Sequence, residues 1–150
     1  MNQSPACGRL EDNLCFAIYA ANHAFTAAYK PLLEPLGLTY PQYLVLLILW
    51  EREGRTVKEI GARMHLDSGT LTPLLKRMEA NGLLHRERDA EDERQVRIRL
   101  TEKGTALQGA VAGVRAQLAC TLDDTEQAIG ALRDALTTLT GRLRGAGNTP

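Results

Sequence analysis

The chain has 150 residues, 44% of them hydrophobic and 24% charged, and its formal net charge is zero. This length and composition predict one domain, residues 1–150, that can bury a hydrophobic core, and the balanced charge argues against a protein that coats nucleic acid without regard to sequence. The longest apolar run, residues 43–50, is far too short to cross a bilayer, and residues 1–8 lack the basic start and apolar centre of a signal peptide, so we expect a cytoplasmic protein.

The first regular pattern covers residues 10–38, and it follows residues 1–9, which we expect to be a mobile terminus. Apolar residues recur there at steps of four and three, which predicts a helix with one apolar stripe. The stripe consists of Leu14, Ile18, Ala21, Phe25, Tyr29 and Leu32. Pro31 and Pro35 disturb this helix, and Gly37 ends it. Such a regular stripe suits an interface with another helix.

The next helix is predicted to begin at Thr39, which can form a capping box with Gln42. Pro41 is tolerated in the first turn, because the N–H that it lacks would have had no helical partner. Residues 43–50, YLVLLILW, are apolar on every face. A helix of this kind must be buried, so we expect it to form the core of the domain.

Two short helices follow. Thr56 and Glu59 can form a second capping box at the start of the first of them. A tight break at residues 65–67 ends it, and Asp67 or Ser68 can cap the second helix.

The second short helix has one apolar stripe and several polar faces. The stripe contains Leu71, Leu74, Leu75 and Met78, which are spaced by three and four residues. Pro73 lies one turn into the helix and confines any kink to its N-terminal end. The other faces carry hydroxyls and cations that can hydrogen-bond phosphates and base edges in a major groove, namely Ser68, Thr70, Thr72, Lys76 and Arg77. We expect this helix to read DNA.

Residues 84–88 and 96–100 predict two strands joined by a tip that is acidic and then basic, and the second strand alternates strictly. Before them, Asn81 and Gly82 supply the left-handed residue that ends a helix. Two helices at a tight turn, followed by a charged hairpin, predict a winged helix-turn-helix in a fold that is mainly α with a small β-hairpin. We expect residues 39–104 to form the DNA-binding unit.

Two further helices follow the hairpin. Thr101 can cap the first, which carries one apolar stripe of Leu107, Val111, Val114 and Leu118. Thr125 can cap the second, whose stripe is typical of a helix that packs against a partner helix and consists of Ile129, Leu132, Leu136, Leu139 and Leu143. Residues 10–38 and 105–145 are therefore predicted to be dimerisation helices. A two-fold homodimer would match the two half-sites of a pseudo-palindromic operator in double-stranded DNA.

The hairpin tip resembles that of the MarR family of transcription regulators. The family pattern D-x-R, followed after five residues by Leu-Thr, is matched by Asp92 and Arg94 with Leu100 and Thr101. The resemblance implies that Arg94 enters the minor groove and that Asp92 helps to orient it. The strand arms are relatively basic, and we include Arg86 among the candidate DNA contacts.

Nearly the whole chain is similar to one branch of that family, the organic hydroperoxide sensors known as OhrR. The stretches LTYPQYLVLLILWE and LDSGTLTPLLKRMEANGL carry the similarity, together with the segment around Cys15 and Tyr19. The resemblance implies that Cys15 is the peroxide-reactive thiolate and that Tyr29 and Tyr40 of the opposite subunit hydrogen-bond it. We expect Tyr19, one turn after Cys15, to support the thiolate as well. It also implies an intersubunit disulfide with Cys120 after oxidation, and control of an organic hydroperoxide resistance gene.

Chemistry is consistent with this assignment. Peroxide attack needs a thiolate, and because a free cysteine has a pKa of about 8.5, donors such as phenol O–H groups must lower it. An apolar lining from Phe16, Phe25 and Trp50 would favour alkyl or fatty-acid peroxides over hydrogen peroxide. The alternative is that Cys15 is simply a small buried hydrophobic residue.

We expect no metal and no cofactor, because His23, His65 and His85 are scattered and lack ligand partners at metal-binding spacing. No phosphate loop or nucleophile pattern indicates an enzyme. Three functions remain open: a repressor that releases DNA when Cys15 is oxidised, a MarR-type repressor released by a small phenolic or lipophilic ligand, and a thiol peroxidase, which the winged unit disfavours.

Overall fold

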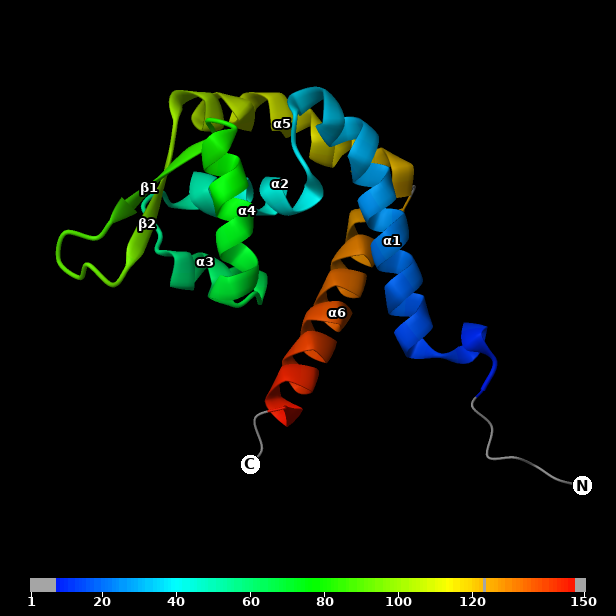
Figure 1. Cartoon of the computed structure of the whole chain (residues 1–150). Helices are drawn as coiled ribbons and strands as arrows, with labels where there is room; N and C mark the ends of the chain where they lie inside the picture. The colour runs from blue at the N-terminus through cyan, green and yellow to red at the C-terminus, as the bar shows by residue number, and fades with distance from the viewer. Residues whose placement is uncertain (1–7, 123, 148–150) are drawn as a thin grey trace, which may run out of the picture. The chain divides into compact units, whose positions relative to one another are not determined.

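A computed structural model describes residues 8–122 and 124–147, and it confirms a mainly helical fold with one two-stranded hairpin (Figure 1). Cys7 and most of the predicted mobile terminus lie outside the described residues. The chain divides into two compact units, Met1–Val114 and Arg115–Pro150. In chain order the elements are η1 (Leu10–Asp12), α1 (Leu14–Leu33), η2 (Glu34–Leu36), α2 (Tyr40–Glu51), α3 (Val57–Met64), α4 (Ser68–Ala80), β1 (Leu84–Arg88), β2 (Val96–Leu100), α5 (Glu102–Leu122) and α6 (Glu126–Ala146).

The N-terminal helix differs from its prediction at both ends. A separate 3-10 turn occupies Leu10–Asp12, because Asn13 is extended (φ −92°, ψ 126°) and its side-chain amide donates to the Arg9 carbonyl at 2.8 Å. At the other end α1 continues through Pro31 to Leu33, and Gly37 in the left-handed region (φ +69°) ends the η2 turn that follows.

The α2 helix is the core of the first unit, as its sequence predicts. Tyr43, Val45, Leu46 and Leu49 are each no more than 1% exposed. Its start is fixed by the predicted capping box, in which the Thr39 N–H donates to the Gln42 amide oxygen at 3.0 Å. Figure 1 shows α2 surrounded by α1, α3, α4 and the hairpin. The apolar helix therefore holds the helix-turn-helix and the first helix of the chain on one core.

The helix-turn-helix forms through local hydrogen bonds. Thr56 and Glu59 make the second predicted capping box, and His65 in the left-handed region (φ 57°) ends α3. Asp67, rather than Ser68, caps α4 by accepting the Thr70 N–H at 2.8 Å. The predicted stripe of α4 is buried, with Leu71, Leu74, Leu75 and Met78 no more than 7% exposed.

The hairpin has the predicted boundaries. Its strands pair in antiparallel register, from Leu84 opposite Leu100 to Arg88 opposite Val96. Gly82 adopts the left-handed conformation expected of it (φ +72°). The hydroxyl of Thr101 accepts the Gly104 N–H at 3.0 Å, which starts α5 as predicted.

Among the described residues, no single helix is both long and apolar enough to cross a membrane. Residues 14–36 and α2 reach that length and composition only when taken together, and the chain bends by 72° at the break between them.

Gly104 provides a test of how closely the start of α5 packs against Leu83 and Leu100. A Cβ at this position would lie 2.1 Å from the Leu83 carbonyl oxygen and 3.2 Å from the Leu100 side chain. We expect Gly104→Ala to lower the free energy of unfolding by about 3 kcal/mol, because backbone must move to make room. Gly109→Ala in the same helix is the control, since nothing lies within 4 Å of its Cβ, and it should be neutral or stabilising by up to about 1 kcal/mol. Urea denaturation measures both, and equal effects would contradict the packing described for Gly104.

Candidate functional site

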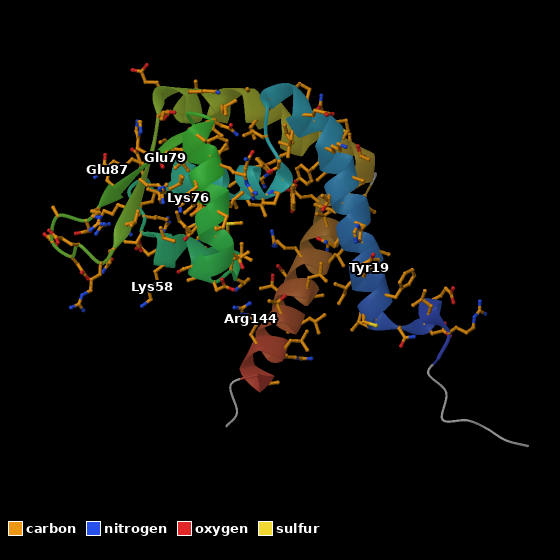
Figure 2. All side chains as sticks on the ribbon, viewed as in Figure 1. Tyr19, Lys58, Lys76, Glu79, Glu87 and Arg144 are labelled. Atoms are coloured by element: carbon orange, nitrogen blue, oxygen red, sulfur yellow. The ribbon has the colours of Figure 1, made fainter. Side chains whose placement is uncertain are left out.

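The exposed faces of α4 present the side chains predicted to read DNA. Ser68, Thr70, Lys76 and Arg77 are exposed and Thr72 is half-buried, on the side of the helix away from the buried stripe. Figure 2 labels Lys76 on α4. Short hydroxyls at the start of a helix and cations along it can hydrogen-bond base edges and phosphates. The described geometry therefore leaves these candidates accessible to a nucleic acid.

Arg86, a predicted DNA contact, has a partner within the protein. Its Nε donates to Glu79 Oε2 at 2.8 Å, and its backbone N–H donates to Glu79 Oε1 at 2.9 Å. These bonds join the end of α4 to the first wing strand, and they hold the pKa of the Glu79 carboxyl below its usual value. This pair was not predicted, because its seven-residue separation crosses a turn and follows neither helix nor strand periodicity.

The hairpin tip is ordered by its aspartates. Asp92 accepts the backbone N–H of Arg94 at 3.1 Å and the side-chain amide of Gln95 at 3.1 Å. The Asp92 carboxylate thus contacts the backbone of Arg94, and the Arg94 side chain is exposed. Asp89, one of several acidic residues near the tip and not a predicted site residue, is only 6% exposed and accepts the backbone N–H groups of Glu91 and Asp92.

Both cysteines of the described residues are free thiols and are exposed on the single chain. Cys15 is therefore not part of the hydrophobic core of one chain. Cys15 lies in the first turn of α1, and large apolar side chains near it on the same helix are also exposed, with Leu14 at 62% and Ile18 at 38%. Cys120 lies near the end of α5, in the second compact unit.

The three predicted tyrosines fall into two groups. Tyr29 is 8% exposed, and its ring lies 4.8 Å from that of Tyr40, with the Phe25 ring 5.6 Å away. Burial, followed by the nearby Tyr43, raises the pKa of the Tyr40 phenol, which therefore keeps its proton and can donate a hydrogen bond at neutral pH. Tyr19 is 61% exposed, and its ring lies 4.4 Å from His23.

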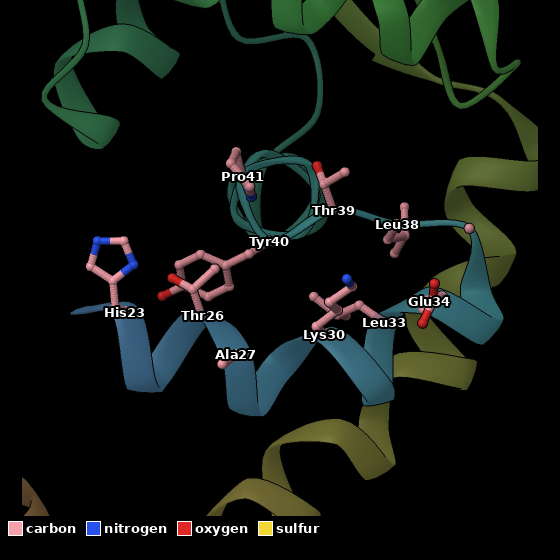
Figure 3. Close-up of a pocket in the computed structure, with 11 residues that line it drawn as sticks. His23, Thr26, Ala27, Lys30, Leu33, Glu34, Leu38, Thr39, Tyr40 and Pro41 are labelled. Carbon is pink, nitrogen blue, oxygen red and sulfur yellow. The ribbon is translucent and has the colours of Figure 1, made fainter. Parts of the chain in front are cut away.

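A pocket of about 590 Å³ opens between α1 and α2 beside Tyr40 (Figure 3). Much of its wall is apolar and includes Ala27, Leu33, Leu38 and Pro41. Phe16, Phe25 and Trp50, the apolar lining expected of the peroxide site, are not among the residues that line this pocket. Trp50 lies at the other end of α2, where its indole N–H donates to the Gly104 carbonyl at 3.0 Å.

The described residues contain no group of three or more His, Cys, Asp or Glu side chains placed to hold a metal ion.

Residues 27–110 match the family described as transcriptional regulator SarA/Rot. The organic hydroperoxide resistance transcriptional regulator of Bacillus subtilis is 49% identical over 138 residues, which cover 87% of this chain and 92% of that protein. The HTH-type transcriptional regulator TtmR of Methylorubrum extorquens is 66% identical over 100 residues, which cover 67% of this chain and 51% of the relative, so this chain spans about half of its length.

Solved structures of AbfR, a protein of Staphylococcus epidermidis, are also similar. Reduced AbfR bound to DNA has a TM-score of 0.77 and 37% identity, covering 90% of this chain and 95% of that one. Disulfide-formed AbfR has a TM-score of 0.65 and 39% identity, covering 88% and 93%.

The Glu79–Arg86 pair gives a prediction for stability. We expect Glu79→Gln to lower the free energy of unfolding by about 1 kcal/mol at neutral pH, because it weakens a charge-assisted contact that is only partly exposed to solvent. The more exposed Glu87–Arg99 pair is the control, and Glu87→Gln should change stability by less than about 0.5 kcal/mol.

The pH dependence of this effect follows from the lowered pKa of Glu79. Its contribution is complete above the usual carboxyl pKa and is lost as pH falls through the lowered value. Denaturant unfolding at pH 7 and pH 3 should therefore show a difference between wild type and Glu79→Gln that shrinks in acid. A difference of equal size at both pH values would contradict the role given to the carboxylate.

Proposed function

Because this chain belongs to the MarR/SarA-Rot type of winged-helix transcriptional regulators, we propose that it is a homodimeric DNA-binding repressor that senses organic hydroperoxides through Cys15. The observation that carries the proposal is the exposed Cys15 thiol on α1 together with the packed phenols of Tyr29 and Tyr40. The 49% identity to a regulator of organic hydroperoxide resistance supports the same signal. The regulated gene is one for organic hydroperoxide resistance.

The terminal helices carry the surface that a second copy of the chain covers. On α6, Leu132 and Leu143 are 63% and 64% exposed, and Leu14 on α1 is 62% exposed. Rows of large apolar side chains rarely stay open to water in a soluble protein. A two-fold dimer buries them and presents two α4 helices and two wings to the half-sites of a pseudo-palindromic operator.

Each half of the dimer binds DNA through two elements. The α4 helix enters the major groove with Ser68, Thr70 and Lys76, and the wing brings Arg94 to the minor groove. Arg86 contributes through its pair with Glu79, which fixes the wing to α4.

Oxidation begins at Cys15. Its thiolate attacks the outer oxygen of the hydroperoxide, the O–O bond breaks, and the alkoxide leaves as an alcohol after taking a proton, which a tyrosine phenol can donate. The product is a sulfenic acid on Cys15. Tyr29 and Tyr40 of the opposite subunit stabilise the reacting thiolate, and Tyr19 lies one turn from Cys15 on the same helix. The pocket beside Tyr40 accepts the apolar part of the peroxide.

A disulfide completes the switch. The thiol of Cys120 in the other subunit attacks the sulfenic sulfur, an S–S bond forms and water leaves, so the two thiols together give two electrons to the peroxide. A disulfide needs Cα atoms less than about 7 Å apart, so its formation constrains both helices and changes the spacing of the two wings. AbfR, which has solved structures both as a reduced form on DNA and as a disulfide form, supports such a cycle in a similar protein.

The same pocket favours a second candidate function. Its apolar walls and the polar groups of His23 and Lys30 could bind a small phenolic or lipophilic ligand that releases the DNA without oxidation. In that case both cysteines are dispensable, which separates the two functions by experiment.

Replacement of Cys15 tests the sensor directly. We expect Cys15→Ser to bind DNA as the wild type does but to ignore organic hydroperoxides at every dose, because a hydroxyl cannot form a sulfenic acid. The measurement is fluorescence anisotropy on a duplex that the wild-type protein enriches from a random-sequence pool, with and without cumene hydroperoxide. Release of the mutant by peroxide would end the sensor assignment.

The partner cysteine is tested on a gel. After peroxide treatment, the wild type should run as a covalent dimer under non-reducing denaturing conditions, and dithiothreitol should restore both the monomer band and DNA binding. Cys120→Ser should remain monomeric on the gel and accumulate sulfinic or sulfonic acid at Cys15, visible by mass spectrometry. Cys7→Ser is the matched control and should behave as the wild type. A dimer that persists without Cys120 but disappears without Cys7 would show that Cys7 is the resolving thiol.

A further inference from the structure

The buried carboxylate of Asp89 lies at the base of the wing tip. Besides the Glu91 and Asp92 N–H groups, which donate at 2.7 and 3.1 Å, it accepts a hydrogen bond from Arg97 Nε on the second strand. These donors, the two backbone N–H groups first, hold the pKa of Asp89 below its usual value, so the group is ionised at neutral pH. The backbone of Asp89 also closes the tip, because its N–H donates to the Gln95 carbonyl at 2.9 Å.

Arg97 connects this carboxylate to the segment that follows α2. Its Nη1 donates to the Gly54 carbonyl at 2.8 Å, although the two residues are 43 positions apart in the chain. The same segment pairs with the second strand: the Gly54 N–H donates to Ile98, and the Ile98 N–H donates to the Arg55 carbonyl at 2.9 Å. Asp89 is therefore linked through one guanidinium to backbone that continues directly from the core helix.

The other acidic residues of the tip make no such connection. The Asp92 carboxylate contacts only Arg94 and Gln95 inside the tip, and the side chains of Glu91 and Glu93 are exposed. Figure 1 shows the tip extending away from α3 and α4. Asp89 and Arg97 lie at its base, where their side chains are bonded to each other.

We propose that Asp89 and Arg97 are positioning residues for DNA binding, which hold the wing at the angle that brings Arg94 to the minor groove. This inference rests on the wing role of Arg94 given above. Neither Asp89 nor Arg97 needs to touch DNA, and both act through the direction of the tip.

The sign of the charge effect separates positioning from simple electrostatics. A carboxylate near a DNA backbone repels phosphates, so removing its charge should strengthen binding if charge alone matters. Asp89→Asn also removes that charge, but it replaces the acceptor that Arg97 needs with an amide. A positioning role therefore predicts that Asp89→Asn binds DNA more weakly than the wild type. The matched Glu91→Gln variant loses the same charge without losing a contact, so it should bind as tightly as the wild type or more tightly.

The experiment is a double-mutant cycle on full-length protein, with affinity for the enriched duplex measured at one fixed salt concentration. Asp89→Asn alone should lower affinity roughly tenfold, the size expected for loss of one charge-assisted hydrogen bond. In the Arg94→Ala background the same change should lower affinity by less than about twofold, because Arg94 is no longer there to be positioned. Arg97→Gln should reproduce both results.

Three outcomes would overturn the proposal. They are an Asp89→Asn variant that binds as tightly as Glu91→Gln, equal losses with and without Arg94, and an Arg97→Gln variant with wild-type affinity. Circular dichroism at the assay temperature confirms that each variant is folded, and Arg94→Ala alone tests the wing role independently. If Arg94→Ala keeps wild-type affinity, the proposed role of the wing fails, whereas a tenfold loss shared equally by both backgrounds refutes only the positioning role.

Discussion

Burial of α2 is the constraint on which the first unit depends. A helix that is apolar on every face has to be covered on every side, and α1, α3, α4 and the second wing strand all pack against it. Its two ends then carry different chemistry. Tyr40 at the first turn contacts the ring of Tyr29, and the residues after Glu51 pair with the wing. One hydrophobic requirement thus packs the helix that carries Tyr29 and the proposed DNA-binding hairpin against the same core helix.

Local signals predicted most of this fold. Thr39, Thr56 and Gly82 act through bonds or conformations within a few residues of themselves, so their roles can be read from spacing, and the hairpin strands began and ended where alternation placed them. The break at Asn13 was not predicted, because an asparagine amide that bonds back to its own backbone competes with the helix without disturbing the apolar periodicity.

The side-chain contacts around the site were beyond such reasoning. The Arg97 bond to Gly54 and the Trp50 bond to Gly104 join residues 43 and 54 positions apart, and they exist only once α2 has brought distant segments together. The Arg86 bond to Glu79 is closer in sequence, but it crosses the turn between α4 and the first strand and so follows no helix or strand periodicity. Charge and aromaticity in a sequence indicate what a side chain can do, and the tertiary fold decides what it contacts.

We propose that one oxidation event per subunit releases DNA, and a stoichiometric titration measures whether it does. Reduced protein bound to its enriched duplex is titrated with cumene hydroperoxide, and the anisotropy of the DNA is followed together with the peroxide consumed. We expect complete release at about one equivalent per subunit, no release by a large excess of salicylate, and recovery of binding with dithiothreitol. Release by salicylate with peroxide unconsumed, or peroxide consumed catalytically far beyond one equivalent, would contradict it.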